Sequence, residues 1–194
     1  MFLDATRYPY LKQLTENVDI ISEELKAALR NDAQVQKALF THMEMDYQSN
    51  QWTWDNAINT AAIGYDLREG SYAMLSLYKT GHNLNIAKNA FPKTLGLLKR
   101  VDGIEYACIS ALSPHAHLAR HTHNRQRYIF HLLLNNLEGG PCEIICINKR
   151  HEMRFIGDTA LFDYSLPHES FSYAENRRFN LMVDFFPPAS GSSQ

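Results

Sequence analysis

The spacing of apolar residues predicts helices in the first part of the chain. Over residues 11–30, apolar side chains recur every three or four positions, at positions 11, 14, 18, 21, 25 and 29. This spacing places them on one face of an amphipathic helix that can pack against a core. A shorter helix is predicted over residues 34–40, because Asn31 and Asp32 are suitable caps just before it. Tyr47, Trp52 and Trp54 follow in a polar stretch, where we expect them to act as packing anchors.

The hydrophobic period changes in the middle of the chain. Residues 72–78, YAMLSLY, predict a strand, and residues 90–101 predict a short helix, because Pro92 suits a first helical turn and leucines follow it. Beyond Gly103, short apolar runs alternate with turn-forming residues, a pattern typical of a β-sandwich or barrel. The predicted strands cover residues 104–112, 116–121, 127–135, 142–147, 153–156, 159–163, 169–173 and 178–185.

These elements predict a single domain over residues 1–186. The chain has 194 residues, enough to bury a sizeable core. Residues 1–101 would form a helical lead-in with a supporting strand, and residues 102–186 the β core. The last segment, PPASGSSQ over residues 187–194, has the composition of a disordered tail.

Charge and cysteine content narrow the functional class. A net charge of −2 gives no basic surface for nucleic acid or an anionic membrane. No apolar run approaches the roughly 20 residues of a bilayer span, and the first residues lack a signal-peptide pattern, so we expect a cytoplasmic protein. Cys142 and Cys146 would lie about 13 Å apart on a strand, too far for a disulfide. We expect both, and Cys108, to be buried thiols.

The segment over residues 110–131 holds five of the nine histidines. Four of them occupy odd-numbered positions close together, and an extended chain sends every second side chain to the same face. These four are therefore expected to line one surface: His115, His117, His121 and His123. A solvated polar face is the ordinary alternative. His168, on a later predicted strand edge, supplies a distant partner, as in β-barrels whose metal site keeps an open coordination position.

Arg178 comes ten residues after His168 and opens the last predicted strand. A buried guanidinium needs a carboxylate or phosphate partner, and if the protein supplies none, a ligand must. Ser110 and His131 could hydrogen-bond the same ligand. The alternative is that Arg178 is a surface residue of the turn that also contains Arg177.

Two segments resemble a known family: RHTHNRQRYIFHLLL, and GDTALFDYSLPHESFSYAENRRFNLMVDFF over residues 157–186. The order of their histidines, glycine, apolar trio, His-Glu pair and following arginine is similar to that of the aspartyl/asparaginyl β-hydroxylases. FPKTLGLLKRV is similar to that family's Pro-Lys-Thr helix. The resemblance covers roughly residues 78–186. It implies a mainly β protein with N-terminal helices, folded as a double-stranded β-helix, which is a jelly-roll or cupin-like barrel.

The resemblance also implies roles for individual residues. By position, His121 and His168 would be ligands of Fe(II). Arg178, helped by Ser110, would bind the distal carboxylate of 2-oxoglutarate. His131 would contact the carboxylate at the metal end of that co-substrate.

Two positions depart from the patterns of related enzymes. Ile129 stands where the family has a second arginine, and Arg127 is the candidate to replace it in 2-oxoglutarate binding. His123 stands two residues after His121. Many iron oxygenases of this fold have an acidic metal ligand two residues after their first metal-binding histidine. His123 is therefore either a third metal ligand or a hydrogen-bond donor beside a metal-bound water.

The implied reaction is hydroxylation of an unactivated C–H bond by Fe(II), 2-oxoglutarate and dioxygen, with release of succinate and carbon dioxide. The substrate would be a small molecule, an amino acid or a peptide, with the β-carbon of an amino acid or of an aspartyl- or asparaginyl-like residue favoured. Two alternatives stay open. One is a cupin-like metalloenzyme that does not use 2-oxoglutarate, and the other is a non-enzymatic ligand-binding barrel with solvated histidines. No feature of the sequence indicates an oligomeric state.

Overall fold

The computed structural model describes residues 1–40, 72–79, 82–83, 85–123 and 126–186. Tyr47, Trp52, Trp54 and the tail over residues 187–194 lie outside these ranges. The helical elements are a 3₁₀ helix Ala5–Arg7, α1 Pro9–Glu16, α2 Val18–Asn31, α3 Ala33–Phe40, α4 Asn85–Ala90 and α5 Pro92–Leu98. The strands are β1 Tyr72–Lys79, β2 His82–Asn83, β3 Ile104–Leu112, β4 His117–His121, β5 Tyr128–Leu133, β6 Cys142–Cys146, β7 Lys149–Met153, β8 Thr159–Asp163, β9 His168–Ser172 and β10 Arg178–Phe185.

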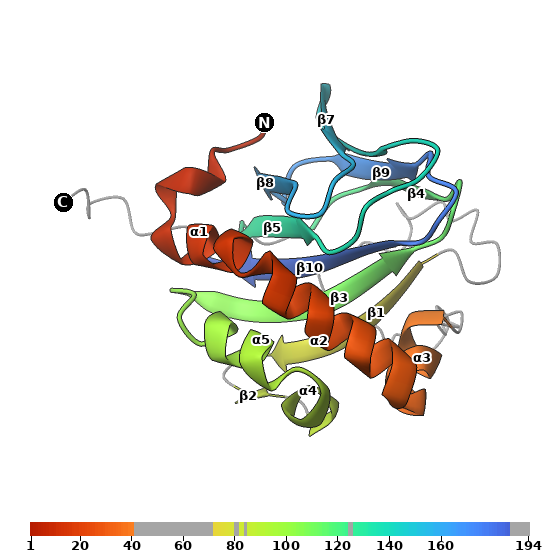
Figure 1. Ribbon diagram of the computed structural model, residues 1–194. Helices are drawn as coiled ribbons and strands as arrows, with labels where there is room; N and C mark the ends of the chain where they lie inside the picture. The colour runs from red at the N-terminus through yellow and green to blue at the C-terminus, as the bar shows by residue number, and fades with distance from the viewer. Residues whose placement is uncertain (41–71, 80–81, 84, 124–125, 187–194) are drawn as a thin grey trace, which may run out of the picture.

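The strands form two antiparallel sheets that face each other (Figure 1). Within the described residues, the larger sheet has the order β2-β1-β3-β10-β5-β8, and the smaller has the order β4-β9-β6-β7. From β3 onward the chain passes repeatedly from one sheet to the other, so that the first strand of this set pairs with the last. Eight strands connected in this way form a jelly roll, here a double-stranded β-helix. The predicted fold class, mainly β with N-terminal helices, is confirmed.

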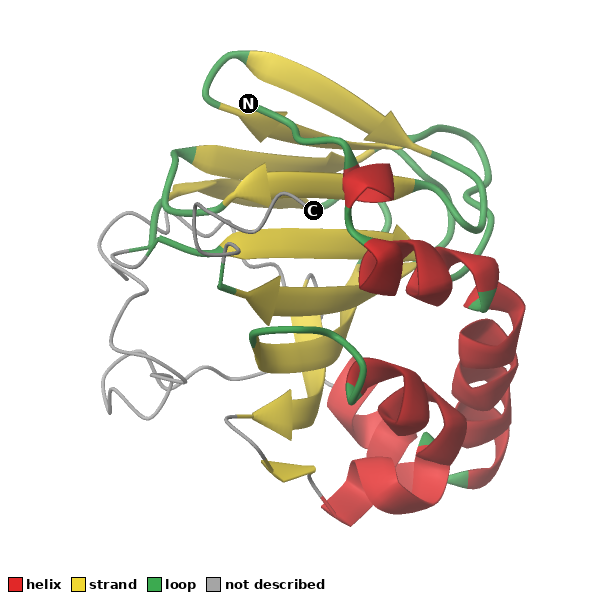
Figure 2. Ribbon diagram, turned by 90° about the vertical axis from the view of Figure 1, so that its left-hand side faces the viewer, coloured by secondary structure: helices red, strands yellow, loops and turns green. Residues whose placement is uncertain are grey.

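Each face of the larger sheet packs against a different layer. Helices cover its outer face, as the rotated view makes clear (Figure 2). On β10, Phe179, Leu181 and Val183 belong to the apolar core shared with these helices. Met182 belongs instead to the core shared with the smaller sheet. Because side chains alternate along a strand, Arg178 and Asn180 also face the barrel interior with Met182.

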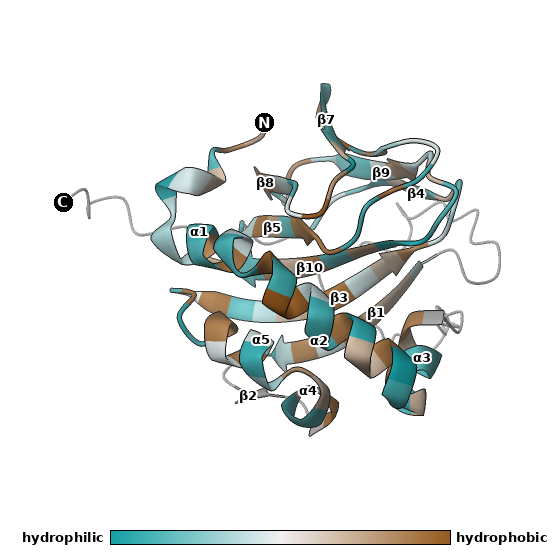
Figure 3. Cartoon of the chain, viewed as in Figure 1, coloured by the Kyte–Doolittle hydropathy of each residue, from teal (hydrophilic) through white to brown (hydrophobic). Residues whose placement is uncertain are grey.

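The N-terminal apolar stripe is as predicted, but it runs over two helices rather than one. Leu11 and Leu14 of α1, and Ile21 and Leu25 of α2, are all buried. In Figure 3, α2 carries hydrophilic and hydrophobic residues side by side, as an amphipathic helix does. The interruption is at Asn17, whose side-chain amide donates to the Gln13 carbonyl at 2.8 Å. Such local side-chain bonds compete with the helical ladder, so Asn17 ends α1.

The cap predicted for the following helix is confirmed at Asp32. Its Oδ1 accepts the backbone N–H groups of Gln34 at 2.8 Å and Val35 at 3.2 Å. These amides lie in the first turn of α3 and have no partner within the helix. The cap therefore fixes where α3 begins.

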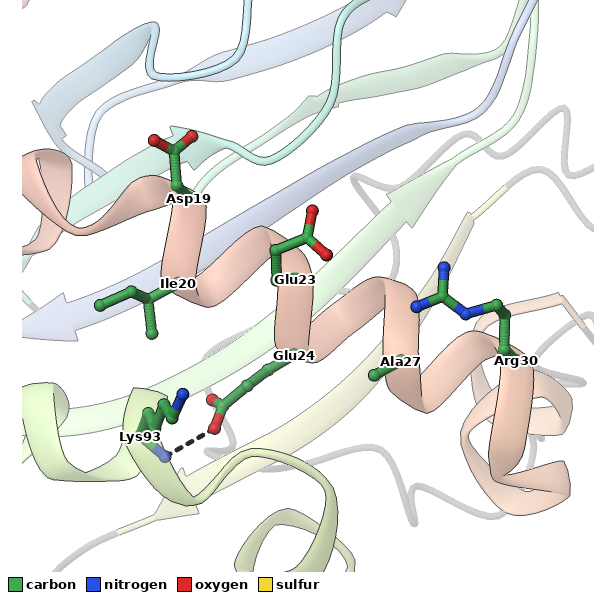
Figure 4. A pocket seen from close by; sticks show the side chains of 7 residues that line it. All are labelled: Asp19, Ile20, Glu23, Glu24, Ala27, Arg30 and Lys93. Atoms are coloured by element: carbon green, nitrogen blue, oxygen red, sulfur yellow. Dashed lines mark hydrogen bonds between the residues drawn. The ribbon is translucent and has the colours of Figure 1, made fainter.

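The N-terminus of α5 is capped by a side chain from another helix. The Glu24 carboxylate of α2 accepts the backbone N–H groups of Lys93 at 2.7 Å and Thr94 at 2.8 Å, and the Thr94 hydroxyl at 2.7 Å. Figure 4 shows this contact at the edge of a shallow surface hollow along α2. A helix N-terminus favours a negative charge and leaves its first amides unpaired, so one carboxylate on a neighbouring helix serves as the cap. The helix predicted over residues 90–101 is shorter than expected at both ends: Ala90 belongs to α4, and α5 ends at Leu98 with Lys99 as its C-cap.

Most predicted strands match within one or two residues at their ends, but the strand predicted over residues 153–156 is wrong. The observed β7 covers Lys149–Met153 and pairs with β6 through a tight turn in which Cys146 lies opposite Lys149. Ile147 adopts a positive φ of 58° in that turn. A β-branched residue rarely takes this conformation, so Asn148 is the only typical turn residue of this two-residue loop. The sequence predicts a turn over residues 148–150, slightly too late, and so places the strand that follows too late as well.

Two further expectations concern the thiols and the membrane. Cys108, Cys142 and Cys146 are buried and free, as predicted. In the part of the chain that the structure describes, no helix is both long and apolar enough to cross a membrane.

Candidate metal centre and buried arginine

Three buried histidines meet at one end of the smaller sheet. His121 ends β4 and lies directly opposite His168, the first residue of β9, and His123 follows two residues after His121. One ring nitrogen from each can be chosen so that all three lie within 4.8 Å of one another. Metal–nitrogen bonds are about 2.0–2.1 Å long, so nitrogens this close need only small movements to share one ion.

The backbone orients two of these rings in the same way. His121 Nδ1 lies 2.8 Å from the Ala119 carbonyl, and His168 Nδ1 lies 2.8 Å from the Leu166 carbonyl. A carbonyl oxygen only accepts, so each Nδ1 carries the proton and donates it. Each Nε2 then presents a lone pair to the space between the rings, which is the usual arrangement of a metal-binding histidine.

Burial keeps all three histidines neutral. Burial is the main reason why the pKa of His121 is lowered. It is also the main reason why the pKa of His123 is lowered to about 2 and the pKa of His168 to about 3. Repulsion between the neighbouring imidazoles lowers the pKa of His123 and of His168 further. A neutral imidazole is the form that binds a metal, so the cluster is ready to do so near neutral pH.

The prediction that four histidines line one face is wrong for two of them. His115 is exposed and has a positive φ of 54°. His117 is also exposed: its ring stacks on Phe171 at a centroid distance of 3.9 Å, and its Nε2 lies 3.1 Å from a Glu169 carboxylate oxygen. The register of β4 shifts by one residue between Leu118 and His121. Such a bulge reverses the alternation of side chains, which separates His117 from the histidines beyond it.

A network of buried polar side chains lies next to His123. The ring of Tyr164 lies 4.0 Å from the His123 ring, centroid to centroid. The Tyr164 hydroxyl donates to Asp184 Oδ2 at 2.8 Å, and Arg127 Nη1 lies 3.5 Å from the same oxygen. Arg127 and Asp184 are both buried. The structure thus places Arg127 near the histidine cluster, with its charge compensated by a carboxylate of the protein.

Unlike Arg127, Arg178 has no carboxylate partner in the part of the chain that the structure describes. Its side chain is buried, 1% exposed, so the alternative of a surface turn residue is wrong. Nη1 donates to Ser170 Oγ at 3.0 Å and to Cys142 Sγ at 3.0 Å. Among the described residues Arg178 forms no ion pair, and its Nε has no hydrogen-bond partner. A buried guanidinium with an uncompensated charge indicates an anionic ligand.

Ser110 and Asn180 lie beside this guanidinium and are fully buried. They face each other across β3 and β10, and within the described chain neither Ser110 Oγ nor Asn180 Oδ1 has a hydrogen-bond partner. Asn180 Nδ2 lies 3.2 Å from His131 Nδ1. His131 is on β5, on the other side of β10 from Ser110. Three predicted ligand-binding residues, Arg178, Ser110 and His131, therefore line one region of the barrel interior.

Sequence reasoning missed several residues of this region: Asn180, Ser170, Cys142, Tyr164 and Asp184. Three of them could have been found from the alternation of side chains along a strand. Asn180 and Asp184 lie at even offsets from Arg178. Ser170 likewise lies two residues after His168. The contacts of Cys142 and Tyr164 depend on how the two sheets pack, which no local pattern specifies.

The geometry indicates a ligand that spans the two groups. Ser170, which contacts Arg178, and His168 lie two residues apart on the same face of β9, which is about 7 Å along a strand. A small molecule could therefore bind the metal with one end and place a carboxylate against Arg178 with the other.

The profile of the family described as Aspartyl/Asparaginyl beta-hydroxylase matches residues 15–188. No curated protein matches the chain.

Solved structures that resemble the chain include three of low sequence identity. The Cupin_2 domain of an XRE-family transcriptional regulator from Enterobacter cloacae is 11% identical over 60% of this chain and 98% of that chain, with a TM-score of 0.42. A predicted oxalate decarboxylase from Thermotoga maritima is 11% identical over 60% of this chain and 81% of that chain, with a TM-score of 0.40. KdgF from Halomonas sp. is 9% identical over 68% of this chain and 94% of that chain, with a TM-score of 0.40.

Proposed function

Because the chain belongs to the aspartyl/asparaginyl β-hydroxylase family, we propose that it is an Fe(II)- and 2-oxoglutarate-dependent dioxygenase that hydroxylates an unactivated C–H bond. The observation that carries the proposal is the buried guanidinium of Arg178, which has no carboxylate partner among the described residues and lies close to a cluster of three neutral histidines. An anion site next to a metal site is what a chelating dicarboxylate requires.

The histidine cluster fits Fe(II). His121 and His168 would provide two imidazole ligands through Nε2, and imidazole suits iron among other first-row metals. His123 would be the third ligand, in the place where many oxygenases have a carboxylate. A neutral third ligand leaves one more positive charge on the ion, which would favour an anionic co-substrate in the remaining positions.

The buried polar groups around Arg178 fit the distal carboxylate of 2-oxoglutarate. Arg178 would donate through guanidinium nitrogens other than Nη1, which already contacts Ser170 and Cys142, and Ser110 would donate through its hydroxyl. Ser170 holds the opposite side of the guanidinium and so orients it toward the ligand.

The metal end of the co-substrate would be bound by His131, with Arg127 as a second candidate. Ile129, which stands in the place of the family's second arginine, is buried and apolar and offers no such contact. Arg127 lies near His123 but is already paired with Asp184. We therefore expect Arg127 to contribute less binding energy than Arg178 does.

Fe(II) and 2-oxoglutarate would supply the activation of dioxygen: one oxygen atom would enter succinate as 2-oxoglutarate loses carbon dioxide, and the other would be inserted into the C–H bond of the substrate. The protein holds the metal, orients the dicarboxylate and excludes water. Water is excluded by the apolar interior around the site, which includes Tyr72, Cys108 and Met182.

The proposed substrate is the β-carbon of an amino acid or of an aspartyl- or asparaginyl-like residue in a peptide, as the family suggests. Partners would be small molecules or peptides, with no role for nucleic acid. A cytoplasmic location, expected from the composition, is part of the same proposal.

The direct test is succinate formation by the purified protein with Fe(II), ascorbate and 2-oxoglutarate, first without substrate and then with a panel of amino acids and peptides. We expect slow substrate-independent turnover and a marked increase with a matching substrate. Metal binding without any binding of 2-oxoglutarate would favour the cupin-like metalloenzyme. Failure to bind any first-row divalent metal would favour a non-enzymatic barrel.

A further inference from the structure

We propose that Asn180 is a positioning residue, whose side-chain amide fixes His131 as the tautomer protonated on Nε2 and so makes His131 a hydrogen-bond donor for a ligand bound in the barrel interior. The assignment of the tautomer depends on this structure alone. Its use, donation to the metal-end carboxylate of 2-oxoglutarate, rests on the proposed function.

The contact between the two side chains determines the tautomer. Asn180 Nδ2 lies 3.2 Å from His131 Nδ1. An amide NH₂ group only donates, so Nδ1 must accept and cannot carry a proton. A neutral imidazole has one proton, which is then on Nε2.

The surroundings hold both partners in place. Asn180 is fully buried, and it neighbours His131 diagonally, because Met182 of the same β10 face lies directly opposite His131 on β5. The ring of Phe162 stacks against His131 with an interplanar angle of 14° and a centroid distance of 5.8 Å. The ring plane of His131 and the amide of Asn180 are therefore both constrained by packing.

The same surroundings keep His131 neutral. Burial lowers its pKa well below the ordinary value, and the nearby positive charge of Arg178 lowers it further. A neutral ring has one donor and one acceptor nitrogen, so the hydrogen bonds of His131 depend on which of the two nitrogens carries the proton. Protonated on Nε2, the ring directs a donor away from Asn180. Protonated on Nδ1, it would present a lone pair there, which repels a carboxylate.

The first experiment measures the tautomer in the absence of metal and ligand. Protein labelled with ¹⁵N-histidine is treated with a chelator, and long-range ¹H–¹⁵N correlation spectra give the protonation of each ring nitrogen. The His131 signals are assigned by their loss in His131→Gln. We expect a protonated Nε2 and an unprotonated Nδ1 in the wild-type protein. An Nδ1-protonated His131 would overturn the proposal.

Two variants at position 180 follow. Asn180→Asp replaces the donor by an acceptor, so the proton of His131 is expected to move to Nδ1 or both nitrogens to become protonated. Asn180→Leu has nearly the same shape and no hydrogen bond, so a mixture of tautomers is expected; it also serves as the test if the buried carboxylate prevents folding. The control is Asn89→Asp on the exposed face of α4, which adds the same charge and should change nothing. Unchanged His131 signals in both position-180 variants would show that another group fixes the tautomer, contrary to the proposal.

The second experiment measures 2-oxoglutarate affinity by calorimetry on protein loaded with Mn(II), which cannot turn over. Loss of a hydrogen bond to a charged group predicts roughly a ten- to hundredfold weaker binding for Asn180→Asp, with Mn(II) affinity unchanged. If the wild-type protein does not bind 2-oxoglutarate, the proposed function fails while the tautomer result stands. If the wild type binds it and Asn180→Asp binds equally well, the positioning role is wrong.

Discussion

His121 and His168 are direct cross-strand partners on β4 and β9, and their rings lie 4.3 Å apart, centroid to centroid. Each ring donates from Nδ1 to the backbone carbonyl two residues earlier in the chain. The two unprotonated Nε2 atoms are therefore oriented before any metal arrives, and binding needs little reorganisation.

Removal of either ring should abolish tight metal binding. We expect His121→Ala and His168→Ala each to weaken Mn(II) or Fe(II) affinity by more than the ~10–100-fold that loss of an outer hydrogen-bond partner costs. The control is His117→Ala, on the same strand as His121 but outside the cluster. Calorimetric titration of the chelator-treated protein measures the effect. Equal metal affinity in all three variants would exclude this cluster as the metal site.

His123→Gly tests whether the third histidine is a ligand. Because a ligand nitrogen of His123 lies within 4.8 Å of those of the other two histidines, we expect a loss of metal affinity comparable with that of His121→Ala. The measurement is the same titration, together with substrate-independent succinate formation. Near-normal metal loading and turnover would mean that His123 lies outside the coordination sphere.

Arg178→Ala should affect 2-oxoglutarate binding far more than metal binding. It removes a charge-assisted contact of about 1.5–3 kcal/mol, which corresponds to roughly a ten- to hundredfold loss of affinity. Arg177→Ala is the matched control, since that half-buried side chain donates to the Leu39 carbonyl instead. Calorimetry with 2-oxoglutarate on the Mn(II)-loaded protein separates the two. An unchanged affinity in Arg178→Ala would remove the main support for the proposed function.

The stability of the metal-free protein should fall as the pH is lowered below about 6.5. The pKa values of His123 and His168 are lowered to about 2 and about 3, so between these values and 6.5 the unfolded chain binds more protons than the folded one. Each such histidine then removes up to about 1.4 kcal/mol of stability per pH unit. Urea unfolding between pH 7.5 and 4.5 measures the slope. The variant His168→Asn should show a shallower slope, and an identical slope in both proteins would contradict the assignment.

Glu24→Ala should destabilise the helical layer. The Glu24 carboxylate caps α5 from a neighbouring helix, and loss of a cap with its charge costs about 1–2 kcal/mol. Glu23→Ala, a neighbouring and exposed change, should have little effect. Thermal and urea unfolding of the two variants provide the comparison. Equal stability of both would mean that backbone groups or water replace the cap at no cost.

Much of the fold follows from local patterns in the chain. Strands such as β3, β8 and β10 have the predicted bounds, because short apolar runs bounded by turn-forming residues are a strong local signal. The stripe that includes Leu11 and Leu25 correctly marked the buried helical face. The identities of His121, His168 and Arg178 as site candidates also came from their order in the sequence and its resemblance to a family.

Other features depend on contacts between distant segments. The bulge after Leu118 separates His117 from His121, and it arises from pairing with β9, so alternation alone misplaced two histidines. The pairing of Arg127 with Asp184 arises because β5 lies beside β10. The absence of such a partner for Arg178 among the described residues appears only when the two sheets face each other. Asn180 gained its role because β10 lies between β3 and β5. A local pattern specifies which face a side chain occupies, but burial and partners are set by the packing of strands far apart in the chain.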